Sequence, residues 1–201
     1  MADTLTATHL RAEDGRIVHL DVRRWMTPAD PVDEALLDRA VGPVLDVGCG
    51  PGRHVRALRS RGVEALGLDV SPTAVALARR WGARVLQHSV FEALPGHGPW
   101  RSALLLDGSV GIGGDPVALL ARVGELLHHD GNVLVEAEGP GVASESMRVC
   151  LETRLRTSPW FAWARLAADD VAAVAARAGF AQAEAWEDGG RYFSSLVRSA
   201  S

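Results

Sequence analysis

The chain has 201 residues, a length that suits one compact domain with a sizeable core. Apolar residues make up 47% and charged residues 23%, which excludes the collagen-like, disordered and coiled-coil classes. The formal net charge of −4 gives no overall attraction to nucleic acid or to an anionic membrane. No run approaches the roughly 20 apolar residues of a membrane helix, and no signal-peptide pattern is visible, so we expect a cytoplasmic protein.

Two features of the composition exclude particular chemistries. All 21 basic residues are arginine, so mechanisms that need a lysine Schiff base or a lysine base are excluded. The two cysteines, Cys49 and Cys150, are too few for a disulfide framework or a zinc site.

From Val44 onward, short apolar runs alternate with helical patterns, which predicts an α/β fold with a largely parallel, doubly wound sheet. Asp30, Ser71 and Asp115 each precede a proline, a pattern typical of a helix start. The expected strands span 44–47, 64–69, 84–87, 102–106 and 132–138. The expected helices span 53–61, 72–81, 116 to a stop at Gly131, and 169–178.

The last two expected strands, 183–187 and 192–198, are separated by a connection centred on Asp188-Gly189-Gly190. This is far too short for a parallel crossover, which needs a dozen or more residues. We therefore expect an antiparallel hairpin, and with it a reversed last strand in the Rossmann-like sheet.

Two segments lie outside the alternation and are expected to form the substrate side. Residues 1–40 read as an N-terminal cap with a strand at 16–22 and a helix from Pro31 through Leu37, and residues 41–201 read as the main domain. Residues 139–168 read as a long irregular insertion in that domain. Aromatic side chains with an arginine suit a planar or carboxylated small molecule. The substrate-binding candidates are Trp25, Trp160, Trp163, Arg165 and Tyr192.

The strongest motif is the run VLDVGCGPG at 44–52, in which a buried strand breaks into three glycines and then enters a helix. Glycines let the backbone turn sharply and approach a ligand, and the helix N-terminus offers unpaired N–H groups. In a doubly wound sheet this loop lies at the carboxyl ends of the strands, where ligands bind.

The glycine spacing separates two classes of ligand. A dinucleotide fingerprint needs G-x-G-x-x-G, but Arg53 stands where its third glycine would be. Asp69 ends the second expected strand, where a carboxylate can accept hydrogen bonds from both ribose hydroxyls of a nucleoside cofactor.

At these residues the sequence resembles the class I S-adenosylmethionine-dependent methyltransferases. The run VLDVGCGPG matches the first motif of that family, LGLDVS matches the second, and LLHHDGNVLVE at 126–136 resembles its passage into the fifth strand. The reversed last strand is also a feature of the family. The resemblance implies a class I methyltransferase fold and S-adenosylmethionine as the cofactor.

The same resemblance implies a set of cofactor contacts. The glycine loop would face the methionine part, Asp46 would orient its ammonium, and Asp69 would hold the ribose. Ser89 takes the place of an acidic residue that the family often has near the adenine. The implied cofactor-binding residues are Asp46, Gly48, Cys49, Gly50, Gly52, Asp69, Val70, Ser89, Val90 and Asp107.

Methyl transfer depends mostly on positioning, with a base needed for a hydroxyl or a protonated amine. The candidate bases near the carboxyl ends of strands are Asp107, His88 and Glu138, with His54 in a flanking loop. His128 and His129 are expected at a helix C-terminus and are discounted as catalysts. Asp107 has no evident second acidic ligand beside it, so we expect no metal.

The sequence therefore predicts an S-adenosylmethionine-dependent methyltransferase that acts on a small molecule such as a specialised metabolite, with the acceptor atom undetermined. Nucleic acid is disfavoured because the D/N-P-P-Y/F tetrapeptide of amino-methylating enzymes is absent after the fourth expected strand. The alternatives are an NAD(P)-dependent oxidoreductase, a non-catalytic cofactor-binding subunit, and a methyltransferase of nucleic acid or protein.

Overall fold

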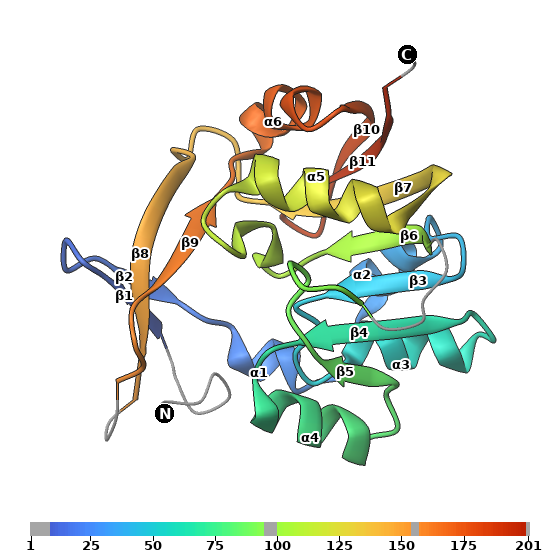
Figure 1. Ribbon diagram of the computed structural model, residues 1–201, viewed down its shortest axis with the longest axis horizontal. Coiled ribbons are helices and arrows are strands. Elements are labelled where there is room, and N and C mark those ends of the chain that lie inside the picture. The colour runs from blue at the N-terminus through green and yellow to red at the C-terminus, as the bar shows by residue number, and fades with distance from the viewer. Residues whose placement is uncertain (1–8, 95–99, 154–156, 200–201) are drawn as a thin grey trace.

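The computed structural model describes residues 9–94, 100–153 and 157–199 (Figure 1). Its main sheet has seven strands in the order β10-β11-β7-β6-β3-β4-β5. Strand β11 pairs antiparallel with both neighbours, whereas the pairs from β7 to β5 are all parallel. The expected doubly wound sheet with a reversed last strand is confirmed. Its strands are β3 (Val44–Val47), β4 (Ala65–Asp69), β5 (Val85–Gln87), β6 (Trp100–Leu105), β7 (Leu127–Ala137), β10 (Phe180–Asp188) and β11 (Arg191–Arg198).

Helices cover both faces of this sheet. Alternate residues of a strand point to opposite faces, so Leu45 packs in one apolar cluster and Val44 in the other. The cluster around Leu45 includes residues of α5 (Pro116–Leu126) and α6 (Val171–Arg177). The cluster around Val44 includes residues of α2 (Pro31–Leu37), α3 (Arg53–Ser60) and α4 (Pro72–Arg80).

Three helices begin as the sequence predicts. The side chains of Asp30, Ser71 and Asp115 each accept a hydrogen bond from a backbone N–H of the first turn, and proline follows each of them. These caps satisfy donors that a helix leaves unpaired at its N-terminus.

The end of α5 differs from the expectation. The helix stops at Leu126 rather than at Gly131, because Leu127 is already extended and begins β7. The pairing of β7 with β6 jumps from Leu127–Trp100 to Asn132–Ser102, so four residues bulge out of the strand. His128 and His129 therefore lie in this bulge and not at a helix C-terminus.

A second, four-stranded antiparallel sheet has the order β2-β1-β8-β9, and we call it the arm sheet. It comprises β1 (His9–Ala12), β2 (Ile17–His19), β8 (Glu145–Glu152) and β9 (Phe161–Arg165). The expectation of an irregular segment at 139–168 is therefore wrong. The expected strand at 16–22 is shorter, since the helix α1 (Val22–Trp25) already begins inside it. Strand β1 pairs with β8 across more than 130 residues of chain, a contact that no local pattern reveals.

The arm sheet lies beyond the end of the main sheet toward which the arrowheads of β4 and β6 point (Figure 1). Single bridges tie it to the loops at that end: Ile112 pairs with Trp163, and Glu138 pairs with Ala167. Residues 9–40 are shared between the two sheets, because β1 and β2 join the arm sheet while α2 packs on the main one. Residues 1–8 of the expected N-terminal cap lie outside the described residues. Over the described ranges, no helix has the length and apolar character needed to cross a membrane.

Candidate active site

The glycine loop after β3 has a backbone that favours glycine. Gly48 and Gly50 have φ values of +72° and +52°, in the left-handed region. A Cβ on Gly48 would stand 2.8 Å from Cδ1 of Ile112, so the loop packs closely there. A Cβ on Gly50 would meet no atom within 4 Å, so the backbone at Gly50 borders open space.

Asp69, at the end of β4, is fixed against this loop. Its Oδ2 accepts a hydrogen bond of 2.8 Å from the N–H of Gly50, and its Oδ1 accepts one of 2.8 Å from the N–H of Ser71. Burial raises the pKa of Asp69 above its usual value, while these backbone donors act in the opposite direction. Each carboxylate oxygen keeps a lone pair for a further donor.

A cavity of about 650 Å³, here called the main cavity, lies between the glycine loop and the arm sheet. This volume is in the range of small-molecule sites. Most of the sequence candidates border it. They are Trp25, Gly48, Cys49, Gly50, Asp69, Val70, His88, Ser89, Val90, Asp107, Trp160 and Trp163.

The other candidates lie elsewhere. Asp46 is buried behind the loop, and Gly52 caps α3, where a Cβ would stand 2.7 Å from that of Ala83. Glu138 and Arg165 border a second cavity of about 240 Å³. Tyr192 borders neither cavity, and its ring packs beside Gly139.

Behind the glycine loop lies a network of buried charges centred on Asp33 of α2, whose side chain is 1% exposed. The Asp33 carboxylate accepts hydrogen bonds from three arginines, namely Arg24 at 3.2 Å, Arg191 at 2.9 Å, and Arg53. One carboxylate thus joins α1, α2, the start of α3 and the start of β11.

Arg53 connects this network to the wall of the main cavity. Its Nη2 donates to both carboxylate oxygens of Asp107, at 2.9 and 2.7 Å, in a bidentate pair. Among the described residues other than glycine, only Asp107 has a positive φ, +54°, and its N–H donates to Glu136. Glu136 in turn binds Arg191 through both of its oxygens.

His54 completes the network between Asp33 and Asp46, at 3.5 and 3.7 Å. Burial lowers the pKa of His54, but the neighbouring carboxylates of Asp33 and Asp46 outweigh it and raise that pKa to about 9. The protonated ring adds a fourth cation to the network. Arg24, Arg53, Arg191 and His54 then face the buried or half-buried carboxylates of Asp33, Asp46, Asp107 and Glu136, and Arg24 also binds Asp30.

This geometry bears on the candidate bases. Asp107 uses both oxygens on Arg53, which favours a positioning role over proton uptake. His54 is a buried ion-pair partner and borders neither cavity. His88 borders the main cavity with one ring nitrogen 3.0 Å from the carbonyl of Ala93. Glu138 contacts Arg165 at 3.2 Å and keeps its second oxygen open.

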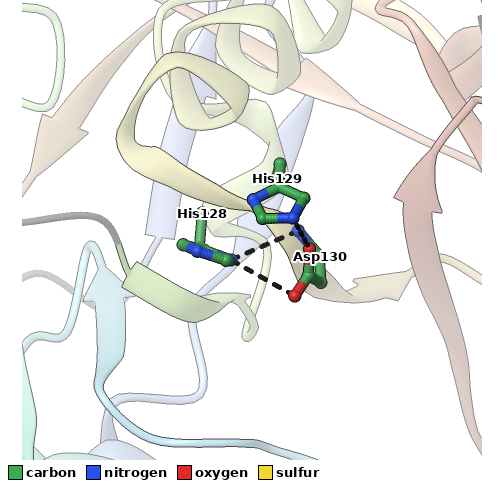
Figure 2. A group of neighbouring side chains, drawn as sticks. All are labelled: His128, His129 and Asp130. Carbon is green, nitrogen blue, oxygen red and sulfur yellow. Dashed lines mark hydrogen bonds and ion pairs between the residues drawn. The ribbon is translucent and has the colours of Figure 1, made fainter.

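A group of potential metal ligands lies away from these cavities. Ligand atoms of His128, His129 and Asp130 lie within 4.8 Å of one another at the bulge of β7 (Figure 2). His129 is 81% exposed and is paired with Asp130. The bulge is at the amino end of β7, whereas the glycine loop follows the carboxyl end of β3.

Sequence reasoning missed Asp33, Arg53 and Arg191 as parts of the site. One signal was present for Arg53, which directly follows the glycine loop. Asp33 is the N3 residue of a capping box, so its sequence position suggests only a helix start.

Comparison with known proteins gives a family match over the core of the sheet. Residues 44–131 match the family model described as a methyltransferase domain. This span runs from β3 through the bulge of β7 and includes the glycine loop and Asp69.

Solved structures resemble the whole chain. A S-adenosylmethionine-dependent methyltransferase from Bacteroides fragilis, in complex with S-adenosyl-L-homocysteine, aligns with a TM-score of 0.79 and 23% identity over 98% of this chain and 90% of that one. The 1,6-didemethyltoxoflavin-N1-methyltransferase of Burkholderia thailandensis aligns with a TM-score of 0.62 and 21% identity, over 85% of this chain and 78% of that one. The amino pentose methyltransferase CalS10 of Micromonospora echinaspora aligns with a TM-score of 0.57 and 21% identity, over 84% of this chain and 87% of that one.

The strand order, the reversed β11 and the glycine loop define a class I methyltransferase fold. Residues 44–131 match the methyltransferase-domain model, and the whole chain has the fold of solved S-adenosylmethionine-dependent methyltransferases. The fold predicted from the sequence is confirmed, and the reversed β11 favours it over the oxidoreductase alternative.

Proposed function

We propose that this protein transfers the methyl group of S-adenosylmethionine to a small molecule held under the arm sheet. The observation that carries the proposal is the main cavity itself. It is bordered on one side by the glycine loop and Asp69, and on the other by aromatic residues of the arm.

The residues present fit the cofactor. The backbone at Gly50 borders open space, and Asp69 is fixed with lone pairs to spare. Ser109 borders the cavity, and its buried hydroxyl makes no hydrogen bond to any of the described residues. A buried polar group of this kind is stabilised when a ligand supplies the missing partner.

We assign the cofactor contacts by the resemblance stated from the sequence. Asp69 holds the ribose hydroxyls, the Gly48–Gly50 backbone faces the methionine part, and Ser89 and Val90 lie along the adenine. Asp46 acts from behind the loop through its charge, since it does not border the cavity. The Arg53–Asp107 pair forms part of the wall of the main cavity.

The acceptor side comprises Trp25, Trp160 and Trp163, with Phe161 beside them. Similar structures support a small acceptor, because their names specify a toxoflavin precursor and an amino pentose. We place the enzyme in the cytoplasm, as the sequence suggests.

The bound cofactor supplies a methyl carbon on a positively charged sulfur, which a nucleophile with a free lone pair can attack. The protein's part is to align the two molecules and to exclude water. The aromatic residues around the main cavity keep water out of it, and the Arg53–Asp107 ion pair in its wall supplies fixed dipoles. No residue of the main cavity has to form a covalent bond.

Calorimetric titration with S-adenosyl-L-homocysteine tests the proposal. We expect wild-type protein to bind it and Asp69→Ala to bind it about 10- to 100-fold more weakly, because hydrogen bonds to a charged group are lost. Asp69→Asn keeps the shape but replaces one acceptor by a donor, so it should also weaken binding.

Glu64→Ala is the matched control. It removes a carboxylate from an exposed ion pair with Arg84 outside both cavities, and should leave the affinity unchanged. An Asp69→Ala variant that keeps its melting temperature and wild-type affinity would contradict the assignment. Absence of binding to the wild type would contradict the proposed function.

A further inference from the structure

The second cavity, of about 240 Å³, adjoins the main cavity and is here called the acidic chamber. Five residues border both spaces, so their side chains form the boundary between them. They are Leu10, Leu20, Trp25, Asp107 and Trp163. The two cavities therefore share a wall that contains Asp107 and the two tryptophans.

Carboxylates outnumber guanidinium groups in the lining of the chamber, although Asp107 and Glu136 are paired with Arg53 and Arg191 outside it. Its lining includes four carboxylates (Asp21, Asp107, Glu136 and Glu138), two guanidiniums (Arg24 and Arg165) and one histidine, His19. The main cavity, by contrast, is bordered mostly by apolar and aromatic side chains.

One nitrogen of each guanidinium is engaged by a carboxylate, whereas Nε of Arg24 is buried and has no partner among the described residues. Nε of Arg165 donates to Glu138 at 3.2 Å. Nη2 of Arg24 donates to Asp30 at 3.1 Å and to Asp33 at 3.2 Å. A carboxylate on the acceptor would compete with these partners and add a further negative charge.

Two of the carboxylates, those of Asp21 and Glu138, can still accept hydrogen bonds from a ligand. The hydrogen bond that the structure gives to Asp21 comes from the backbone N–H of Arg24, which does not neutralise its charge. Glu138 is 43% exposed and keeps one oxygen free of protein partners. A cation entering the chamber would therefore meet carboxylates ready to accept its protons.

Trp25 and Trp163 also favour a cation in the acidic chamber. A cation within about 6 Å of an indole face is attracted by the ring quadrupole. Aromatic rings beside carboxylates suit an ammonium group and offer nothing comparable to an anion.

We propose that the acceptor is an amine-bearing small molecule whose ammonium group is bound in the acidic chamber. This inference rests on the proposed function and specifies its substrate class. The carboxylated acceptor suggested by Arg165 in the sequence is disfavoured, because Glu138 occupies that arginine.

Matched probes of opposite charge test the inference by binding rather than by activity. Tryptamine and indole-3-propionate share a ring and a side-chain length, as do phenethylamine and 3-phenylpropionate. Each probe is titrated by calorimetry at pH 7.5 into protein saturated with S-adenosyl-L-homocysteine. We expect the amine of each pair to bind at least about fivefold more tightly than the acid.

Glu138→Gln should reverse the preference, because it removes a negative charge and releases Arg165. The amine should then lose about fivefold in affinity and the acid should gain. Asp21→Asn is a second variant that keeps an N-cap side chain on α1, and it should weaken the amine alone. Glu64→Gln, in an exposed ion pair elsewhere, should change neither.

Two results overturn the inference: acids that bind as tightly as amines, or the absence of amine binding in both pairs. Either is distinguishable from failure of the proposed function, which shows itself earlier as absent binding of S-adenosyl-L-homocysteine. A Glu138→Gln variant that melts as the wild type does and keeps its preference also overturns it.

Discussion

At the scale of single residues, the glycine loop shows how much a motif determines locally. The spacing of Gly48, Gly50 and Gly52 predicted a sharp turn after a buried strand, and all three have positive φ. Their roles differ, however, since Gly48 is packed against Ile112 whereas Gly50 faces open space. That difference depends on η1 (Ser109–Gly111) and the loop after it, which lie more than 50 residues further along the chain.

Gly50→Ala tests the loop backbone. Its positive φ costs alanine about 1–2 kcal/mol, which should lower the melting temperature by roughly 2–8 °C. Gly62→Ala is the control, because Gly62 also has a positive φ and no atom within 4 Å of a Cβ. Both variants should lose similar stability in thermal denaturation, but only Gly50→Ala should lose affinity for S-adenosyl-L-homocysteine. Equal affinities would show that the loop does not contact the cofactor.

At the scale of elements, helices and parallel strands follow from the sequence, and the arm sheet does not. Caps such as Asp115-Pro116 act within one turn, so local pattern suffices for them. Strand β8 pairs with β1 far away in the chain, and β9 has a single buried residue, Ala164, among exposed and half-buried ones. The sequence of residues 139–168 therefore shows no regular strand pattern, although the segment forms two strands of the arm sheet.

The contact of α2 with the rest of the site depends on Asp33. In Asp33→Ala, the buried Arg53 and Arg191 lose the carboxylate that they share, which costs about 3–5 kcal/mol although Arg53 keeps Asp107 and Arg191 keeps Glu136. The expected fall in melting temperature is roughly 6–20 °C. Asp38→Ala, just after the same helix, is the control, because this 76% exposed partner of Arg61 should contribute less than about 1 kcal/mol. A small effect of Asp33→Ala, comparable to the control, would show that the network does not stabilise the fold.

At the scale of the whole molecule, the balance of the buried charges makes stability depend on pH. The pKa of His54 is about 9 in the folded protein and about 6.5 in the unfolded chain. A group whose pKa rises on folding stabilises fully below its unfolded pKa and loses that effect as pH rises through its folded pKa. Stability should therefore fall between pH 6.5 and 9, by about 3 kcal/mol at most.

Urea denaturation at a series of pH values measures this dependence. His54→Gln cannot titrate and should show a flatter profile over that range. His129→Gln removes an exposed histidine and should keep the wild-type slope. A wild-type profile without any fall between pH 6.5 and 9 would contradict the protonated state of His54.

The sequence by itself determined the fold class, the glycine loop, the place of Asp69 at the end of a strand and the reversed hairpin, because each depends on neighbouring residues and on chain lengths between elements. Only the tertiary structure decided the arm sheet, the charge network around Asp33 and the acidic chamber. Their partners are separated by up to 158 residues, as in the pair of Asp33 with Arg191. Such pairings are selected by burial and charge balance in the folded chain, and no local pattern carries that information.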